Sequence, residues 1–110
     1  MQLVLHGEVI YGIDVDSQTR CDHYRTDLDI IAIKFKCCGF WFPCYECHSE
    51  IADHETKVWP RDERDTVAIL CGACGYQLSI TEYLGCASTC PGCLSKFNPG
   101  CSKHYHLYFA

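Results

Sequence analysis

The chain has 110 residues, of which 48% are hydrophobic and 13% aromatic, and this suits one small domain with a working core. Eleven cysteines, far above ordinary usage, indicate that disulfides or metal ions cross-link the fold. The formal charge of −5 disfavours nucleic acid as a partner, and the sequence has no apolar run of the ~18 residues that a membrane helix needs.

The first segment, residues 2–15, predicts a short hairpin, with Gly7 and Gly12 as possible bends. The start MQLVLHGEVIYG has neither the basic region nor the long apolar stretch of a secretory signal. We therefore expect a reducing, cytoplasmic setting, in which clustered cysteines favour metal over disulfides.

A half-buried strand is predicted over residues 30–36, IIAIKFK. Ile31, Ile33 and Phe35 alternate with Ala32 and two lysines, so we expect only one face of the strand to be buried. The strand leads directly into a pair of cysteines.

Four further elements follow in chain order. The segment 45–54, YECHSEIADH, has no Gly or Pro and predicts a short helix. The charged segment 60–66, PRDERDT, predicts a loop, and residues 67–70 predict a short apolar strand. Ser79 and Glu82 have the spacing of a capping box, which indicates one or two helical turns.

Eight candidate zinc ligands precede the charged loop, enough for two closed tetrahedral sites. A C-x2-C turn points both sulfurs the same way, whereas the neighbours Cys47 and His48 should diverge and bind different ions. We therefore expect two interleaved sites. One consists of Cys21, His23, Cys44 and Cys47, and the other of Cys37, Cys38, His48 and His54.

A third site is indicated after the loop, where CGAC (71–74) and CPGC (90–93) are separated by fifteen residues. Two such knuckles are typical of a zinc ion held by four thiolates. The expected ligands are Cys71, Cys74, Cys90 and Cys93. The alternative is a pair of structural disulfides or redox dithiols, which a reducing setting disfavours.

The combined pattern resembles the CHY zinc-finger family. The motifs that support the resemblance are CDHY at 21–24, CC at 37–38, CYECH at 44–48, a second histidine six residues later, and the paired knuckles. The resemblance runs from Cys21 to the end of the chain and implies three zinc ions. The same module precedes a RING domain in some ubiquitin ligases, but we expect no RING domain in this chain. The ending FNPGCSKHYHLYF looks closest to stand-alone members. One of these, in the mitochondrial intermembrane space, supports an oxidative import relay by keeping its oxidoreductase free of metal.

The expected fold is a small, irregular α+β zinc-finger domain spanning residues 1–110. It would comprise an N-terminal hairpin (1–20), a two-zinc cluster (21–58) and a four-cysteine half (67–110). Closed sites leave no position for chemistry, so we expect three structural Zn²⁺ ions and no enzymatic activity. The expected function is docking of a protein partner or assistance in assembly, without nucleic acid or membrane. The alternative is a thiol redox switch or a zinc-handling partner of an oxidoreductase, in the intermembrane space if the organism is eukaryotic.

Several residues lie outside this scheme. Phe40, Trp41 and Phe42 either complete the core around the metal sites or present an apolar patch to a partner. His6-Gly7-Glu8, followed by Pro43 and Cys44-x2-Cys47, matches the sequence motif of zinc deaminases. A deaminase zinc keeps one coordination position for water, whereas Cys21 and His23 would fill that position here. We expect Asn98-Pro99-Gly100 to form a turn before a final strand in HYHLYF (104–109). Two interpretations are left for Cys86, Cys101, His104 and His106. They are inert thiols and imidazoles, or they form a redox pair or a fourth metal site.

Overall fold

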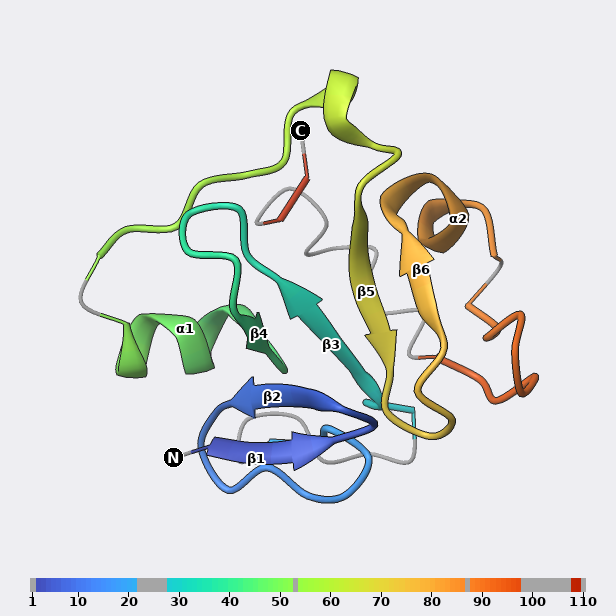
Figure 1. Ribbon diagram of the computed structural model, residues 1–110, viewed down its shortest axis with the longest axis horizontal. Helices are drawn as coiled ribbons and strands as arrows, with labels where there is room; N and C mark the ends of the chain where they lie inside the picture. Colours follow the sequence, from blue (N-terminus) through green and yellow to red (C-terminus); the bar gives the residue numbers. More distant parts are fainter. Residues whose placement is uncertain (1, 22–27, 53, 87, 98–107, 110) are drawn as a thin grey trace.

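One six-stranded sheet with two short helices organises the computed structural model, which describes residues 2–21, 28–52, 54–86, 88–97 and 108–109 (Figure 1). The sheet has the strand order β1-β2-β4-β3-β5-β6. Its strands are β1 (Gln2–Leu5), β2 (Glu8–Tyr11), β3 (Ile31–Lys34), β4 (Trp41–Phe42), β5 (Val67–Cys71) and β6 (Gln77–Ser79). The helices are α1 (Tyr45–Ile51), α2 (Ile80–Leu84) and the 3-10 turn η1 (Arg61–Glu63). None of the helices in these ranges has the length and apolarity to cross a bilayer.

The N-terminal hairpin is confirmed over β1 and β2, which pair antiparallel with Leu5 opposite Glu8. The two residues between them, His6 and Gly7, have φ values of 52° and 81°. Such left-handed pairs match the twist of a two-residue hairpin turn. Gly12 is not part of this bend; its Cα lies against Pro43, where a Cβ would approach the proline ring to 2.9 Å.

The strand β4 was not predicted, and it connects the hairpin to the rest of the sheet. It pairs antiparallel with β3 and parallel with β2, where Ile10 lies opposite Trp41. This pairing places Ile10 and Trp41 around Ala32, while Ile31 and Ile33 belong to the main core. Ala32 is fully buried against Ile10, Trp41 and Leu70, so the expectation of a half-buried strand was wrong at this position.

The helix α1 begins at Cys44, whose Sγ accepts a hydrogen bond from the Cys47 backbone N–H at 3.3 Å. It ends at Ile51, three residues before the predicted end, because Ala52 is extended with ψ of 149°. The helix α2 confirms the predicted capping box. Ser79 Oγ accepts from the Glu82 N–H at 3.1 Å, and Glu82 Oε1 accepts from the Ser79 N–H at 2.9 Å.

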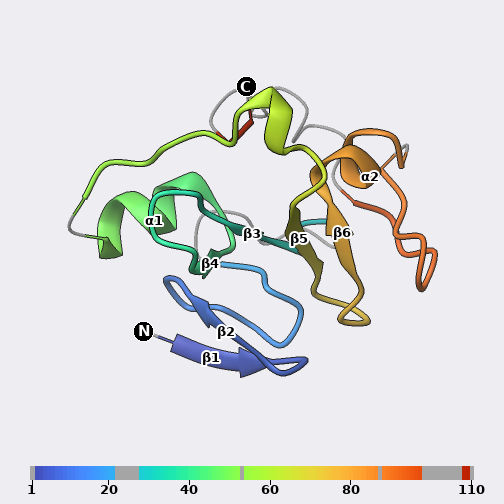
Figure 2. The same ribbon diagram turned by 45° about the horizontal axis from the view of Figure 1, so that its top comes forward.

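The described end of the chain is fastened to the segment that follows α1. The Trp59 N–H donates to the Tyr108 carbonyl at 2.8 Å, and Trp59 forms an isolated parallel bridge with Phe109. Figure 2 shows this end beside η1, which occupies part of the predicted charged loop. Most of the predicted final strand, residues 104–107, and the turn at 98–100 lie outside the described residues.

The main core lies on one face of the sheet, and every candidate ligand group borders it. Its large members are Phe35, Phe42, Leu78, Ile80, Tyr83, Phe97, Tyr108 and Phe109. The structure therefore confirms the expected small α+β domain, in which clusters of cysteine and histidine accompany a modest apolar core.

Candidate metal centres

The most deeply buried group consists of Cys21, Cys44 and Cys47, whose sulfur atoms lie within 4.8 Å of one another. Cys44 and Cys47 come from the first turn of α1, and Cys44 Sγ lies 3.6 Å from Cys21 Sγ. The Ile13 N–H donates to Cys47 Sγ at 3.4 Å. The expected fourth ligand, His23, lies outside the described residues.

The second group brings together Cys37, Cys38, His48 and His54, again with ligand atoms within 4.8 Å of one another. His48 Nε2 lies 3.2 Å from Cys37 Sγ, and the His48 ring stacks on Phe35 with centroids 4.5 Å apart. Two neighbours on α1, Cys47 and His48, thus point into different groups. This is the interleaving that the sequence predicts.

The third group joins the two knuckles. Cys71 Sγ lies 3.9 Å from Cys93 Sγ, and Cys74 Sγ lies 3.6 Å from Cys90 Sγ, so both of these contacts join one knuckle to the other. None of the described cysteines is in a disulfide. The grouping therefore suits one ion between four sulfurs better than a disulfide within each knuckle.

Both knuckles have the same backbone. The N–H of Cys71 donates to the Tyr76 carbonyl and the N–H of Cys90 donates to the Ser95 carbonyl, each at 2.9 Å. The second turn bond repeats as well, from Gly75 to Cys71 at 2.8 Å and from Leu94 to Cys90 at 2.9 Å. Gly75 and Leu94 are both left-handed, with φ of 83° and 65°.

A third turn of this kind holds Cys38, and the sequence interpretation missed it. The Phe35 N–H donates to the Phe40 carbonyl at 3.0 Å, and the left-handed Gly39 donates to the Phe35 carbonyl at 2.7 Å. Phe35 thus takes the position of the first knuckle cysteine, and Cys37 supplies a sulfur from within the turn. The available signal was FKCCGF beside CGACGY, in which a cysteine and a glycine recur at the same places.

The unit repeats beyond the turn. The strands β3 and β4 flank the turn at 35–40 and lead into α1, and β5 and β6 flank the knuckle at 71–76 and lead into α2. The chain therefore contains two strand–knuckle–strand–helix units side by side in one sheet, with β3 paired to β5.

The titration behaviour of the sulfurs reflects their crowding. Hydrogen bonding with Cys21 raises the pKa of Cys47 to about 12, and burial raises the pKa of Cys71 above its ordinary range. Hydrogen bonds with the side chain and backbone of Ser95 lower the pKa of Cys93 to about 6. Clustered thiolates repel one another, and a divalent cation between them would offset that repulsion. The donors, sulfur and imidazole nitrogen only, are those that zinc prefers.

The residues of the deaminase-like pattern have other contacts. The ring of His6 donates through Nε2 to the Gly72 carbonyl at 2.9 Å. Glu8 accepts from Trp41 Nε1 at 2.8 Å and from Gln77 Nε2 at 3.3 Å. Neither side chain belongs to the Cys44–Cys47 group.

Phe40, Trp41 and Phe42 were expected either to complete the core or to form an apolar patch for a partner. Trp41 and Phe42 are buried, as expected of core residues, and only Phe40 is exposed, at 51%. The interpretation that all three rings form an exposed apolar patch is therefore wrong.

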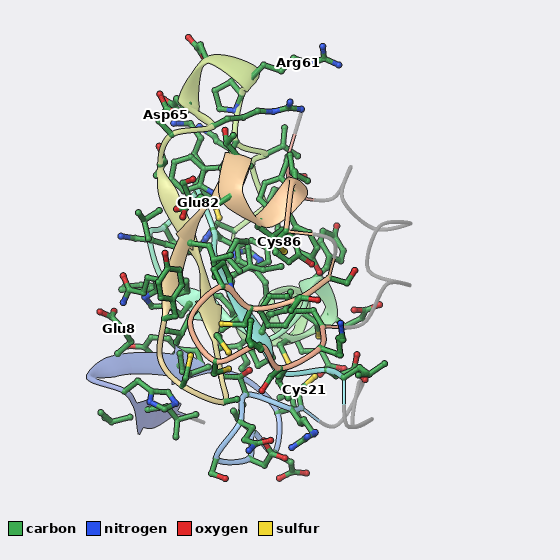
Figure 3. All side chains as sticks on the ribbon, turned by 90° about the vertical axis from the view of Figure 1, so that its right-hand side faces the viewer. Glu8, Cys21, Arg61, Asp65, Glu82 and Cys86 are labelled. Carbon is green, nitrogen blue, oxygen red and sulfur yellow. The ribbon has the colours of Figure 1, made fainter. Side chains whose placement is uncertain are left out.

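Cys86 is half-buried, and its S–H donates to the Tyr83 carbonyl at 3.1 Å, outside all three groups. Figure 3 labels it beside α2 and apart from Cys21. Cys101, His104 and His106, which could have joined it in a redox pair or a fourth site, lie outside the described residues.

Comparisons with known proteins agree with this geometry. The CHY zinc finger family model matches residues 21–83. The chain is 45% identical over 103 residues to Helper of Tim protein 13 of Saccharomyces cerevisiae, covering 91% of this chain and 89% of that protein. It is 42% identical to the Kluyveromyces lactis protein of the same name, covering 91% and 87%. An uncharacterized protein of Schizosaccharomyces pombe is 34% identical over 100 residues, covering 91% and 88%.

Proposed function

We propose, from the premise that this chain belongs to the CHY zinc finger family, that it is a non-enzymatic assembly helper held together by three structural zinc ions. The observation that carries the proposal is the presence of three separate groups of soft ligands, each within 4.8 Å. The proposed ligands are Cys21, His23, Cys44 and Cys47; Cys37, Cys38, His48 and His54; and Cys71, Cys74, Cys90 and Cys93.

A structural role for the metal follows from the ligand count. Four protein ligands complete a tetrahedral zinc ion and leave no position for water or substrate. Zinc binding in model fingers contributes on the order of 10 kcal/mol per site, which would supply much of the folding free energy of a domain this small. The relatives with assigned names are helpers, which agrees with a binding role.

The proposed partner is a Tim protein, because two relatives that span nearly the whole chain are named as helpers of a Tim protein. We assign the role to the mitochondrial intermembrane space in preference to the cytoplasm, because the stand-alone family members that the chain resembles include one that works there. A second candidate function is zinc handling for an oxidoreductase. It is favoured by the exposure of Cys74 and Cys93, two of the four knuckle thiols.

Native mass spectrometry beside a denatured control tests the metal count. We expect three zinc ions in the native protein and none after denaturation in acid. Co-purification from mitochondria then tests the partner, with a small Tim protein as the expected companion. Fewer than three ions would remove one of the proposed sites, and binding of an unrelated protein in place of a Tim protein would overturn the assembly role.

A further inference from the structure

The geometry points to the four-cysteine group as the place where zinc is exchanged with an outside acceptor, with Cys74 and Cys93 as the first ligands to leave. This inference rests on the proposed function, since it assumes that all three groups hold zinc. It adds a division of labour, in which two groups near α1 keep the fold together and the knuckle group gives up and regains its ion.

The exposure of the cysteine ligands separates the three groups. Cys21, Cys44 and Cys47 are at most 3% exposed, so an acceptor cannot reach their sulfurs without opening the core. In the second group His54 is exposed, but His48 is 1% exposed and lies against the Phe35 and Phe42 rings, and both cysteines are half-buried. Cys74 and Cys93 are exposed, while their partners Cys71 and Cys90 are fully buried.

The two exposed thiols come from different knuckles, so each half of the site has one accessible and one anchored ligand. An incoming thiol can therefore replace Cys74 and then Cys93 while Cys71 and Cys90 still hold the ion. Each substitution exchanges one zinc–sulfur bond for another, the proton of the incoming thiol passes to the departing cysteine, and no oxidation state changes. Stepwise replacement of this kind avoids releasing a free ion.

The surface around these thiols suits contact with a partner. Leu94, directly after Cys93, is 73% exposed, although it is a large apolar side chain. Tyr76, two residues after Cys74, is 38% exposed and lies over the second knuckle, where a Cβ at Gly92 would meet its ring at 2.9 Å. The knuckle at 90–93 also lies at the margin of the molecule, beyond β6 and α2 (Figure 1). The acceptor that fits is a protein that offers paired thiols beside an apolar contact.

Competition with EDTA, followed by brief alkylation with N-ethylmaleimide, tests the order of release. Trypsin should cleave after Lys36, Lys57, Arg64 and Lys96. The four cysteines of the knuckle group then lie on peptide 65–96, and Cys37, Cys38, Cys44 and Cys47 lie on peptide 37–57. Cys86 also lies on peptide 65–96 and would be labelled there, so the experiment uses the Cys86→Ser variant. Wild-type protein is treated in parallel, and sequencing of its peptide fragments shows which cysteine carries the label. We expect one zinc ion to be lost first, together with labelling of 65–96 and not of 37–57.

Tyr76→Ala provides a second readout, because it uncovers the second knuckle without removing a ligand. We expect faster release from 65–96 and unchanged release from 37–57. Simultaneous loss of all three ions, or earlier labelling of 37–57, would overturn the exchange proposal while leaving three structural zincs intact. Untreated protein with no zinc on the four cysteines would instead overturn the proposed function.

Discussion

His6 Nε2 lies 2.9 Å from the carbonyl oxygen of Gly72, so the turn of the N-terminal hairpin is hydrogen bonded to the first knuckle. The two residues are 66 positions apart in the chain. A carbonyl only accepts, so Nε2 carries the proton. The His6 ring also lies against Gly75, where a Cβ would approach its Cγ to 2.7 Å. The knuckle backbone thus positions the hairpin.

His6→Ala should lower the free energy of unfolding by about 1 kcal/mol, because it removes one partly buried hydrogen bond and its packing. Zinc content should not change, since His6 belongs to no ligand group. Denaturant titration measures the first effect, and hydrogen exchange of β1 and β2 should rise with it. The matched control is Val4→Ala in the same hairpin, where the side chain is 64% exposed. Equal losses in both variants would contradict a specific role for His6.

Gly72→Ala should destabilise the protein by roughly 2 kcal/mol or more, because a Cβ would overlap the Gln18 carbonyl and the Thr19 hydroxyl. The four-cysteine group should lose zinc affinity, since Cys71 is adjacent. The control is Gly85→Ala, where the nearest atom to a Cβ is the Thr81 carbonyl at 3.4 Å. Thermal unfolding of both variants gives the comparison, and a tolerated Gly72→Ala would show that this contact yields easily.

Cys74→Ser should remove one zinc ion and leave the other two, because its partners come only from the knuckles. Native mass spectrometry counts the ions, and Cys86→Ser, outside every group, should keep all of them. If Cys74→Ser emptied the whole protein, the three groups would have to fold as one unit.

Much of the candidate site was predictable because its signals are local. C-x2-C spacing predicts which sulfurs share a knuckle, and the divergence of Cys47 and His48 on a helix predicts the interleaving. The capping box of α2 and the hairpin of β1 and β2 also depend on short-range chemistry.

The features that the sequence did not predict correctly depend on contacts between distant segments. Trp41 and Phe42 form a strand because β2 and β3 lie on either side of them, and two residues carry no periodicity of their own. Ala32 is buried by residues from three other strands, which alternation along β3 cannot reveal. The likeness of FKCCGF to a knuckle is hidden because Phe35 replaces the first cysteine.

Acid should destabilise the protein through His48. Burial, with a contribution from the nearby His54, lowers the pKa of the metal-free His48 imidazole below its ordinary value of 6.5, and a zinc ion on this ring would also favour its neutral form. The unfolded chain therefore takes up a proton that the folded state resists, so this stabilisation is present above pH 6.5 and is lost as pH falls toward the folded value. Denaturant titrations from pH 7.5 downward should show falling stability below about pH 6.5. An NMR titration that placed His48 at or above 6.5 would contradict the expected direction.

Leu94→Asn should stabilise the protein by about 1 kcal/mol, because a left-handed backbone is costly for leucine and is tolerated by asparagine. Leu94 has φ of 65° and is largely exposed, so little packing is lost. The control Leu94→Ala removes the same side chain but retains the backbone cost, and should give no such gain. Identical unfolding midpoints for the two variants would rule out strain at this position.

The attachment of residues 108–109 to Trp59 has a consequence for biogenesis. The Tyr108 hydroxyl also accepts from the Tyr45 N–H at 3.0 Å, at the start of the helix that carries Cys47 and His48. A nascent chain leaving the ribosome, or one threading through a translocation pore with its N-terminus first, cannot complete this arrangement until Tyr108 has emerged. The hydrogen bond that joins Tyr108 to the start of α1 is therefore one of the last contacts to form.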